Sequence, residues 1–389
     1  MTAHRNHSRP MRRTPLYPAH QALGARLIEF GGWEMPVQYT SIADEHLAVR
    51  NAAGVFDISH MGEVLIDGAE AARFLNHVLC NDIGRLVPGQ GQYTLLCNER
   101  GGVVDDLYAY RLGDQEYLLI VNASRATTDF EWLQRQLADF AGARNVRLRD
   151  VSPDFGAIAI QGPKVAGFID ACFKGPSTSG TPVNSASELT KNECSQFNFG
   201  GTQVWLSRTG YTGEDGFEVV ARSDVIEAIW NKVLEQGKPH GLKPAGLGAR
   251  DTLRTEMCYP LYGHELDENT SPLEAGVGFF VALGKDNFIG KAALAAQKER
   301  GLAKKLAAFK MTGKAAPPRP DYAIWTGADP ATLIGKVVSG TQSPSLSIGI
   351  GMGYVPPEFA KPGTPLQVEV RGKKFAAVVV AKPLYRKPG

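Results

Sequence analysis

The sequence lacks several features that would place it in a class at once. It has no apolar run near the roughly 20 residues that a membrane-spanning helix requires. It also has no excess of positive charge, because 42 Lys and Arg residues stand against 40 Asp and Glu. A nucleic-acid-binding protein usually carries a concentrated basic face. We therefore expect neither a membrane nor a nucleic acid as a partner.

Cysteine is scarce, and the few cysteines are widely separated. No two of them have the C-x-x-C spacing of a zinc site or a redox motif. The sequence therefore predicts no metal site, and an odd, scattered set of thiols is typical of a reducing compartment. The five residues are Cys80, Cys97, Cys172, Cys194 and Cys258.

Acidic residues are absent from the first 13 positions, which hold four arginines. This composition faintly resembles a mitochondrial presequence. However, the first core-like pattern starts at Thr14, which leaves little room for a cleavable segment. We interpret 1–13 as a disordered basic tail and expect a bacterial cytoplasmic protein, or a mitochondrial matrix protein if the source is eukaryotic.

With 389 residues, the chain is long enough for two or three domains. Strands and helices alternate in 14–297, where we expect two interleaved α+β domains, one of them at about 55–150. Charges cluster at 298–305 and suggest a linker. Short apolar runs separated by Gly and Pro follow, so we expect a β-rich domain at 298–389, as a small barrel or sandwich.

Local patterns predict the structure of three individual segments. The spacing of Leu23, Leu27 and Phe30 predicts a helix over 20–30 that ends at two glycines. The apolar run at 55–61 predicts a strand that continues to residue 66. The segment 175–188 is rich in Ser, Thr, Pro and Gly, so we expect an exposed and poorly ordered loop.

The most informative stretch is 207–218, which reads SRTGYTGEDGFE. Three glycines recur at every third position, and apolar residues precede and follow them. This pattern predicts two strands joined by a turn whose backbone passes close to a neighbour or a ligand. The alternative is a plain β-hairpin with surface carboxylates. We expect Glu214 and Asp215 to lie at its solvated tip.

Two adjacent carboxylates, Asp105 and Asp106, lie in a predicted strand at 103–110. Neighbouring residues of a strand face opposite ways, so only one of the two can point into a given cavity. The pattern does not decide which one. The alternative is an exposed Asp pair that ends a turn.

Taken together, six motifs resemble the T-protein family of the glycine cleavage system, the aminomethyltransferases. The resemblance extends over 14–386 and includes the ending KPLYR at 382–386. The motifs are FGGWEMP at 30–36, FDISHM at 56–61, GGVVDDL at 101–107, the stretch at 207–218, GLGARD at 246–251 and YGHELDEN at 262–269.

This resemblance implies a fold and a reaction. The fold would be an α+β cloverleaf of two antiparallel-sheet α+β domains, one ferredoxin-like, and a C-terminal β-barrel or jelly-roll-like domain around a central folate cavity. The implied reaction transfers the methylene carbon of the aminomethyl group on lipoylated H-protein to tetrahydrofolate. Its products would be ammonia, 5,10-methylenetetrahydrofolate and dihydrolipoyl H-protein. No flavin and no metal are expected.

The resemblance also implies roles for particular residues. Asp106 would be the catalytic carboxylate, because a fixed anion stabilises the cationic character that develops as ammonia leaves. Glu218 would bind the pterin ring, since a carboxylate can accept two parallel N–H donors. Arg250 and Arg386 would contact the anionic glutamyl tail. The remaining expected folate contacts and pocket walls are Tyr211, Tyr93, Asn122, Met61, Leu65 and Tyr108.

Alternatives remain open for several of these features. Arg250 could instead pair with Asp251 or Glu256. We do not assign His60 or His264 to a base or a metal, because no second ligand stands at helical spacing. Two other functions fit the same resemblance: a demethylase-type domain of flavin enzymes, and a folate-binding accessory protein of iron–sulfur assembly. The first would need an N-terminal flavin domain, and the second a Lys-Gly-Cys-Tyr segment that the sequence lacks.

Overall fold

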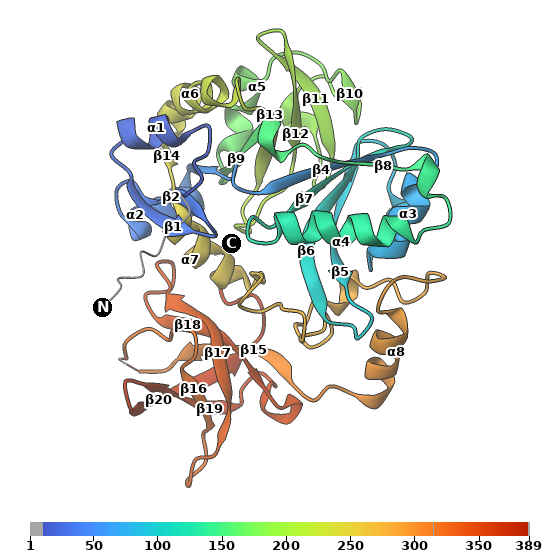
Figure 1. The fold of residues 1–389 in the computed structure, drawn as a ribbon. Helices are drawn as coiled ribbons and strands as arrows, with labels where there is room; N and C mark the ends of the chain where they lie inside the picture. The colour runs from blue at the N-terminus through green and yellow to red at the C-terminus, as the bar shows by residue number, and fades with distance from the viewer. Residues whose placement is uncertain (1–10, 314, 388–389) are drawn as a thin grey trace, which may run out of the picture.

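The computed structural model describes residues 11–313 and 315–387. Figure 1 shows three bodies around helix α7 (Leu247–Met257): a seven-stranded sheet, a five-stranded sheet and a β-barrel. The last described residues return to the middle of the molecule, where the Tyr385 amide donates to the Glu256 carbonyl oxygen of α7 (Figure 1). The expected α+β fold class with a C-terminal barrel is therefore confirmed.

The N-terminal segment forms α1 (Tyr17–Ala22), β1 (Arg26–Phe30), β2 (Trp33–Gln38) and α2 (Ile42–Asn51). The prediction of one helix over 20–30 is wrong, because β1 pairs with β2 in an antiparallel hairpin. Leu23, expected on the buried side of that helix, is 42% exposed. Residues 1–10 of the expected disordered tail lie outside the described residues. Residues 11–13 contradict that expectation, since Arg12 bridges to Trp33 and Arg13 pairs with Glu34.

The seven-stranded sheet is antiparallel except at one edge, where β14 runs parallel to β3. One face packs against α5 (Ile169–Cys172) and α6 (Ile226–Gly237), through side chains such as Trp230 and Val233. The other face packs against α2 and α7. Its strands, in spatial order, are β10 (Ser179–Gly180), β11 (Cys194–Phe199), β12 (Thr202–Ser207), β13 (Gly216–Arg222), β9 (Phe155–Gln161), β3 (Ala53–Asp57) and β14 (Leu242–Pro244).

The five-stranded sheet forms a ferredoxin-like unit with one extra edge strand, β5. Helices α3 (Ala71–Val78) and α4 (Ala126–Ala138) cover one face, where Phe74 and Leu133 are fully buried. Its other face meets the seven-stranded sheet through a cluster that includes Tyr110 and Cys194. Its strands, in spatial order, are β5 (Gln90–Cys97), β6 (Val103–Arg111), β7 (Glu116–Val121), β4 (Gly62–Asp67) and β8 (Arg147–Asp150).

The C-terminal barrel is closed by six antiparallel strands, which removes exposed sheet edges. It follows α8 (Lys291–Arg300), a helix that occupies part of the expected linker at 298–305. The strands, in spatial order, are β15 (Lys305–Met311), β18 (Gly349–Val355), β17 (Leu333–Gln342), β16 (Ala323–Thr326), β19 (Pro365–Val370) and β20 (Lys373–Val380).

Two further expectations differ from the structure. The apolar run 55–66 is not one strand: β3 ends at Asp57, and β4 begins at Gly62 in the other sheet. The segment 175–188 is more ordered than expected, because it contributes β10 to a sheet and buries Ala186 completely. In both cases the pairing partner lies outside the segment, so the local sequence does not reveal it.

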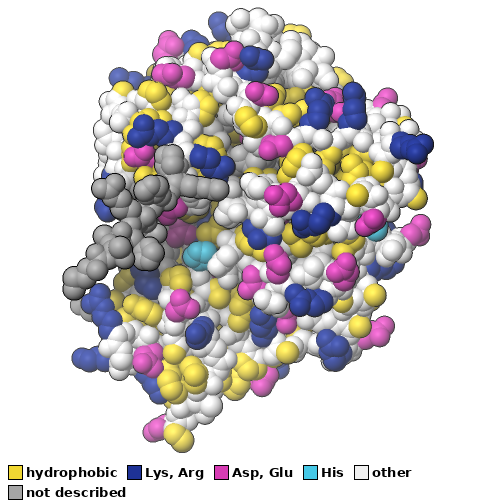
Figure 2. Space-filling view, in the orientation of Figure 1, with side chains coloured by type: hydrophobic (Ala, Val, Ile, Leu, Met, Phe, Trp, Pro, Cys, Tyr) yellow, Lys and Arg dark blue, Asp and Glu magenta, His cyan; other side chains and the backbone are white. Residues whose placement is uncertain are grey.

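Charges of both signs are interspersed over the visible face of the molecule, without a broad patch of one sign (Figure 2). This distribution matches the nearly equal numbers of basic and acidic residues. Over the part of the chain that the structure describes, no helix has both the length and the apolarity to cross a membrane.

Candidate active site

Asp106 lies in the middle of β6 and is held by two side chains. The Tyr93 hydroxyl donates to Asp106 Oδ2 at 2.9 Å, and the Asn122 amide donates to Oδ1 at 3.0 Å. Tyr93 reaches Asp106 because it is paired with Tyr108 in the adjacent strand, two residues further along the same face. Asn122 follows β7 directly. The carboxylate is therefore fixed from both neighbouring strands.

Asp105 points to the opposite face of the same strand, as strand alternation requires. Its Oδ1 and Oδ2 accept hydrogen bonds from the side chain and backbone of Asn122, at 2.9 and 3.0 Å. Burial and the neighbouring Asp105 raise the pKa of Asp129, on α4, to about 11. Asp129 is thus protonated at neutral pH. Asp105 belongs to the fully buried side of the sheet, whereas Asp106 is partly accessible.

The environment of Asp106 shifts its protonation into the neutral range. Burial and the charge of Asp105 raise the pKa of Asp106 to about 7, against the opposing effect of the hydrogen bonds from Tyr93 and Asn122. A group with this pKa can both accept and release a proton near pH 7. Perturbed pKa values of this kind are concentrated at functional sites.

The stretch 207–218 forms the predicted hairpin turn between β12 and β13, and Ser207 pairs with Glu218 across it. Only Gly213 of its three glycines has a positive φ, of 81°. The other two allow close packing: a Cβ atom would lie 1.8 Å from Gln161 Oε1 at Gly210 and 2.4 Å from the Ile160 carbonyl oxygen at Gly216. The turn is therefore packed tightly against β9, rather than free at the surface.

Glu218 is the third residue of β13, close to the turn. Its Oε2 accepts a hydrogen bond of 2.6 Å from the Thr209 hydroxyl. Burial raises the pKa of Glu218, while the Thr209 hydrogen bond and the positive charge of Arg250 oppose this effect. Glu218 in turn raises the pKa of Tyr108, second to burial. Glu218 thus lies close to both Arg250 and the tyrosine face of β6.

The expectation for the tip of this turn is half right. Asp215 is 41% exposed and pairs with Arg208 at 2.6 Å. Glu214, by contrast, has a side chain only 7% exposed, and it pairs with Arg50 at 3.0 Å. The expected solvated position of Glu214 is therefore wrong, because a guanidinium from α2 neutralises it in the interior.

Arg250, near the start of α7, places its guanidinium over the ring of Tyr211, 4.7 Å from the ring centroid. The alternative partners are engaged elsewhere: Asp251 pairs with Arg254, and Glu256 pairs with Arg50. Within residues 11–313 and 315–387, Arg250 makes no ion pair. Its charge is therefore available for an anion.

Tyr211 and Arg250 lie between Asp106 on β6 and Glu218 on β13, as the electrostatic effects of these groups on one another indicate. Burial raises the pKa of Tyr211. The charge of Asp106 raises this pKa further, and the charge of Arg250 lowers it, so Tyr211 lies near both side chains. Arg250 in turn is close to Glu218. All of these side chains are partly exposed although they lie inside the fold. The expected residues that the structure brings together are Tyr93, Asp106, Tyr108, Asn122, Tyr211, Glu218 and Arg250.

Three expected residues lie differently. Met61 packs against the apolar cluster under α2 and α7, and Leu65 packs against the cluster between the two sheets. Arg386 is exposed and lines a cavity of about 270 Å³ beside the turn. Arg50, Glu214 and Tyr385 also line this cavity, whereas Asp106 and Glu218 do not.

Three further partners of the site, Thr209, Phe280 and Tyr259, were not among the expected residues. The Thr209 hydroxyl donates to Glu218, and the ring of Phe280 packs against Tyr93 in a tilted arrangement, with ring centroids 4.5 Å apart. The ring of Tyr259 stacks on Tyr211 at 5.8 Å. Thr209 could have been noticed as a polar residue inside the glycine-rich stretch. The two aromatic residues come from distant segments and have no local signature.

The histidines near the site do not form a metal centre. Burial and the positive charge of Arg250 lower the pKa of His60 to about 4, so His60 is neutral at pH 7. His264 lies 2.9 Å from the Val338 carbonyl oxygen. Where the chain is described, no group of three or more His, Cys, Asp or Glu residues is arranged to hold a metal ion.

Comparison with known proteins identifies the family of this chain. A family model described as the GCVT N-terminal domain matches residues 16–285, and one described as the glycine cleavage T-protein C-terminal barrel domain matches residues 304–386. The chain belongs to the glycine cleavage T-protein family. The family resemblance and the expectation of an enzyme of the transferase class are thereby confirmed.

Known relatives and a solved structure match nearly the full length of the chain. The aminomethyltransferase of Alkaliphilus oremlandii is 43% identical, over 96% of this chain and 98% of the relative. That of Bacillus pumilus is 45% identical, over 97% and 99%. The crystal structure of the glycine cleavage system aminomethyltransferase T from Bartonella henselae superposes with a TM-score of 0.86 at 31% identity, covering 96% of this chain and 98% of that one.

Proposed function

We propose that this T-protein family member catalyses the aminomethyltransferase reaction with tetrahydrofolate and lipoylated H-protein. The methylene carbon exchanges its bonds to sulfur and to the amine nitrogen for bonds to two folate nitrogens. The two folate N–H protons leave with the thiol and with ammonia, so atoms and charge balance. The products are 5,10-methylenetetrahydrofolate, ammonia and dihydrolipoyl H-protein.

Asp106 is the proposed catalytic carboxylate. It would accept or orient the proton of the attacking folate nitrogen and stabilise the cationic carbon–nitrogen unit as ammonia leaves. The observation that carries this role is a partly accessible carboxylate, held by Tyr93 and Asn122, with a pKa of about 7. Asp105 is the weaker candidate, because its side chain is fully buried and lies beside Asp129 of α4.

Glu218 is the proposed partner of the pterin ring. A carboxylate matches the parallel ring N–H and amino donors of that ring, and Thr209 occupies only one of its oxygens in the structure. Tyr211 would pack on the folate, and Arg250 would bind a carboxylate of the glutamyl tail. Arg386 would meet the tail further out, and Met61, Leu65 and Tyr108 would form walls. The bacterial relatives support a cytoplasmic location.

The experiment supplies the purified protein with aminomethylated H-protein and tetrahydrofolate and measures ammonia release. We expect release that depends on both substrates in the wild type. Asp106→Asn should retain the fold and lower turnover by about 10²- to 10⁴-fold. Asp215→Asn is the matched control, because it removes an exposed carboxylate of the turn. Equal activity of Asp106→Asn and the wild type would remove Asp106 from the mechanism, and no release from the wild type would refute the function.

A further inference from the structure

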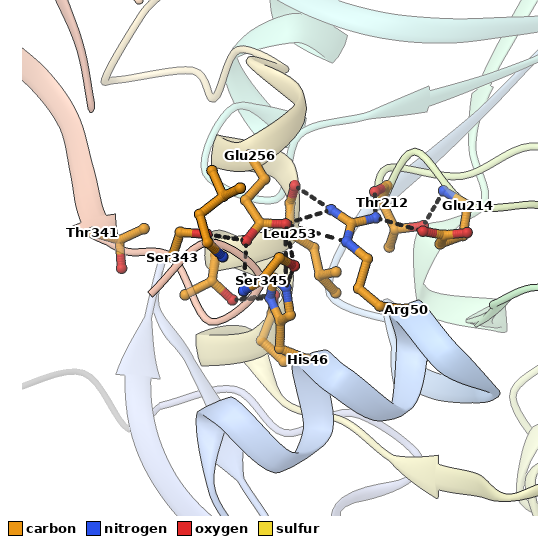
Figure 3. Close-up of polar contacts among 12 residues, drawn as sticks. His46, Arg50, Thr212, Glu214, Leu253, Glu256, Thr341, Ser343 and Ser345 are labelled. Atoms are coloured by element: carbon orange, nitrogen blue, oxygen red, sulfur yellow. Dashed lines mark hydrogen bonds and ion pairs between the residues drawn. The ribbon is translucent and has the colours of Figure 1, made fainter. Parts of the chain in front are cut away.

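Arg50 occupies a buried position at the end of α2, outside the side chains assigned to folate or catalysis. Its side chain is 2% exposed, and those of its partners Glu214 and Glu256 are 7% and 0% exposed. Figure 3 shows Arg50 between Glu256 of α7 on one side and Thr212 and Glu214 of the glycine-rich turn on the other. One guanidinium therefore joins two segments far apart in the sequence.

The hydrogen bonds of Arg50 account for all five of its N–H groups. Nη1 donates to the Thr212 carbonyl oxygen at 2.7 Å and to Glu214 Oε1 at 3.0 Å. Nε and Nη2 donate to Glu256 Oε2 at 3.2 and 2.9 Å, and Nη2 also reaches the Leu253 carbonyl oxygen at 3.4 Å. Because its donors are all engaged by the protein, Arg50 has none left for a substrate.

The C-terminal segment contacts the same guanidinium. The ring of Tyr385 lies over Arg50, with the guanidinium carbon 4.6 Å from the ring centroid. The Tyr385 amide donates to the Glu256 carbonyl oxygen at 3.0 Å. Lys387 approaches Glu214 Oε2 at 3.6 Å. The turn, α7 and the C-terminal segment thus converge on Arg50.

Glu256 is itself fixed from the barrel. The Ser343 hydroxyl, and at 3.2 and 2.9 Å the amide and hydroxyl of Ser345, donate to its carboxylate. His46 lies 3.2 Å away. Although burial alone would raise it, the hydrogen bonds from His46 and Ser343 and the charge of Arg50 hold the pKa of Glu256 at about 2. Arg50 therefore pairs with a carboxylate that is ionised at neutral pH and that the barrel loop also holds.

Each of the three segments carries proposed folate contacts: Tyr211 and Glu218 on the turn, Arg250 on α7 and Arg386 beside Tyr385. We propose that Arg50 is a positioning residue, which sets the distances among these folate contacts without touching the folate. This inference rests on the proposed function. The physical basis is the planar guanidinium of Arg50, which donates to Glu214 and to Glu256 at the same time. A lysine ammonium is a compact point charge and cannot bridge both carboxylates.

The test is Arg50→Lys, with the affinity for tetrahydrofolate measured by titration in the absence of H-protein. We expect binding to weaken by about tenfold or more, because a lysine keeps the charge but cannot hold both the turn and Glu256. The matched control is Arg254→Lys. Arg254 is also 2% exposed and pairs with buried Glu265 at 2.9 Å, but it donates no hydrogen bond to the turn. The control should lower stability while leaving folate affinity within about threefold of the wild type.

A double-mutant cycle separates positioning from general destabilisation. Glu214→Ala should weaken folate binding, and Arg50→Lys combined with Glu214→Ala should weaken it less than the product of the single effects, because both changes release the same turn. Wild-type affinity in Arg50→Lys, equal losses in Arg50→Lys and Arg254→Lys, or fully multiplicative effects would each overturn the inference. A wild-type protein that does not bind tetrahydrofolate would instead refute the proposed function.

Discussion

The pH dependence of the reaction gives a sharp test of the role of Asp106. With a pKa of about 7, Asp106 would be about 9% ionised at pH 6 and about 91% ionised at pH 8. If the ionised form carries the reaction, kcat/KM for tetrahydrofolate should rise about tenfold over this range. His60 does not contribute to that rise, because its pKa of about 4 leaves it neutral throughout.

Tyr93→Phe identifies the group that titrates. The Tyr93 hydroxyl donates to Asp106 at 2.9 Å and thereby stabilises the ionised carboxylate. A hydrogen bond to a charged group contributes about 1.5–3 kcal/mol, which corresponds to about one to two pKa units. Because Asp106 is only partly buried, we expect the lower end, a shift of the profile by about one unit to higher pH.

The assay measures initial rates of ammonia release at limiting tetrahydrofolate, from pH 5.5 to 8.5, for the wild type and Tyr93→Phe. Circular dichroism at each pH separates catalytic titration from unfolding. A flat wild-type profile would refute the assignment of the pKa to Asp106. A profile that Tyr93→Phe leaves in place, or moves to lower pH, would refute the role given to the hydrogen bond.

Three further outcomes follow from the structure. Glu218→Gln should weaken tetrahydrofolate binding by about tenfold, and Asp215→Asn should not; equal affinities in a titration would contradict the pterin assignment. Gly210→Ala should lower the free energy of unfolding by about 1–3 kcal/mol, measured with denaturant, because a Cβ atom would lie 1.8 Å from Gln161 Oε1; an unchanged midpoint would show that the turn yields. Glu256 has its pKa lowered from 4.5 to about 2, so its stabilisation is present above pH 4.5 and is lost as the pH falls through 2. Wild type should therefore lose stability faster than Glu256→Gln in this range, and parallel curves would exclude that contribution.

The sequence predicted those parts of the fold whose signals are local. The β-rich C-terminal region, for example, follows from its short apolar runs and from the Gly and Pro residues between them. The hairpin of β1 and β2 was missed because the spacing of Leu23, Leu27 and Phe30 matches one face of a helix, whereas in β1 Leu27 and Phe30 face opposite sides of the strand. Only the pairing with Trp33–Gln38 decides between the two.

Prediction of the site is limited in the same way, because its geometry depends on segments far apart in the sequence. Strand alternation predicted that Asp105 and Asp106 face opposite sides, but both sides of that sheet are covered. The choice between them depends on which face meets helices and which meets the second sheet. The position of Glu214 was predicted wrongly for a related reason. Its partner Arg50 lies 164 residues away, and no local pattern reports it.

One sheet is inserted in the sequence of the other, and this insertion affects the order in which the chain folds. The ferredoxin-like unit is inserted between β3 and β9, and its first and last strands, β4 and β8, are neighbours that pair Val64 with Asp150. An insert whose ends already meet shortens the effective loop that the enclosing sheet must close. We therefore expect the inserted unit to fold early, and the enclosing sheet, with its long-range pairings, to form more slowly around it.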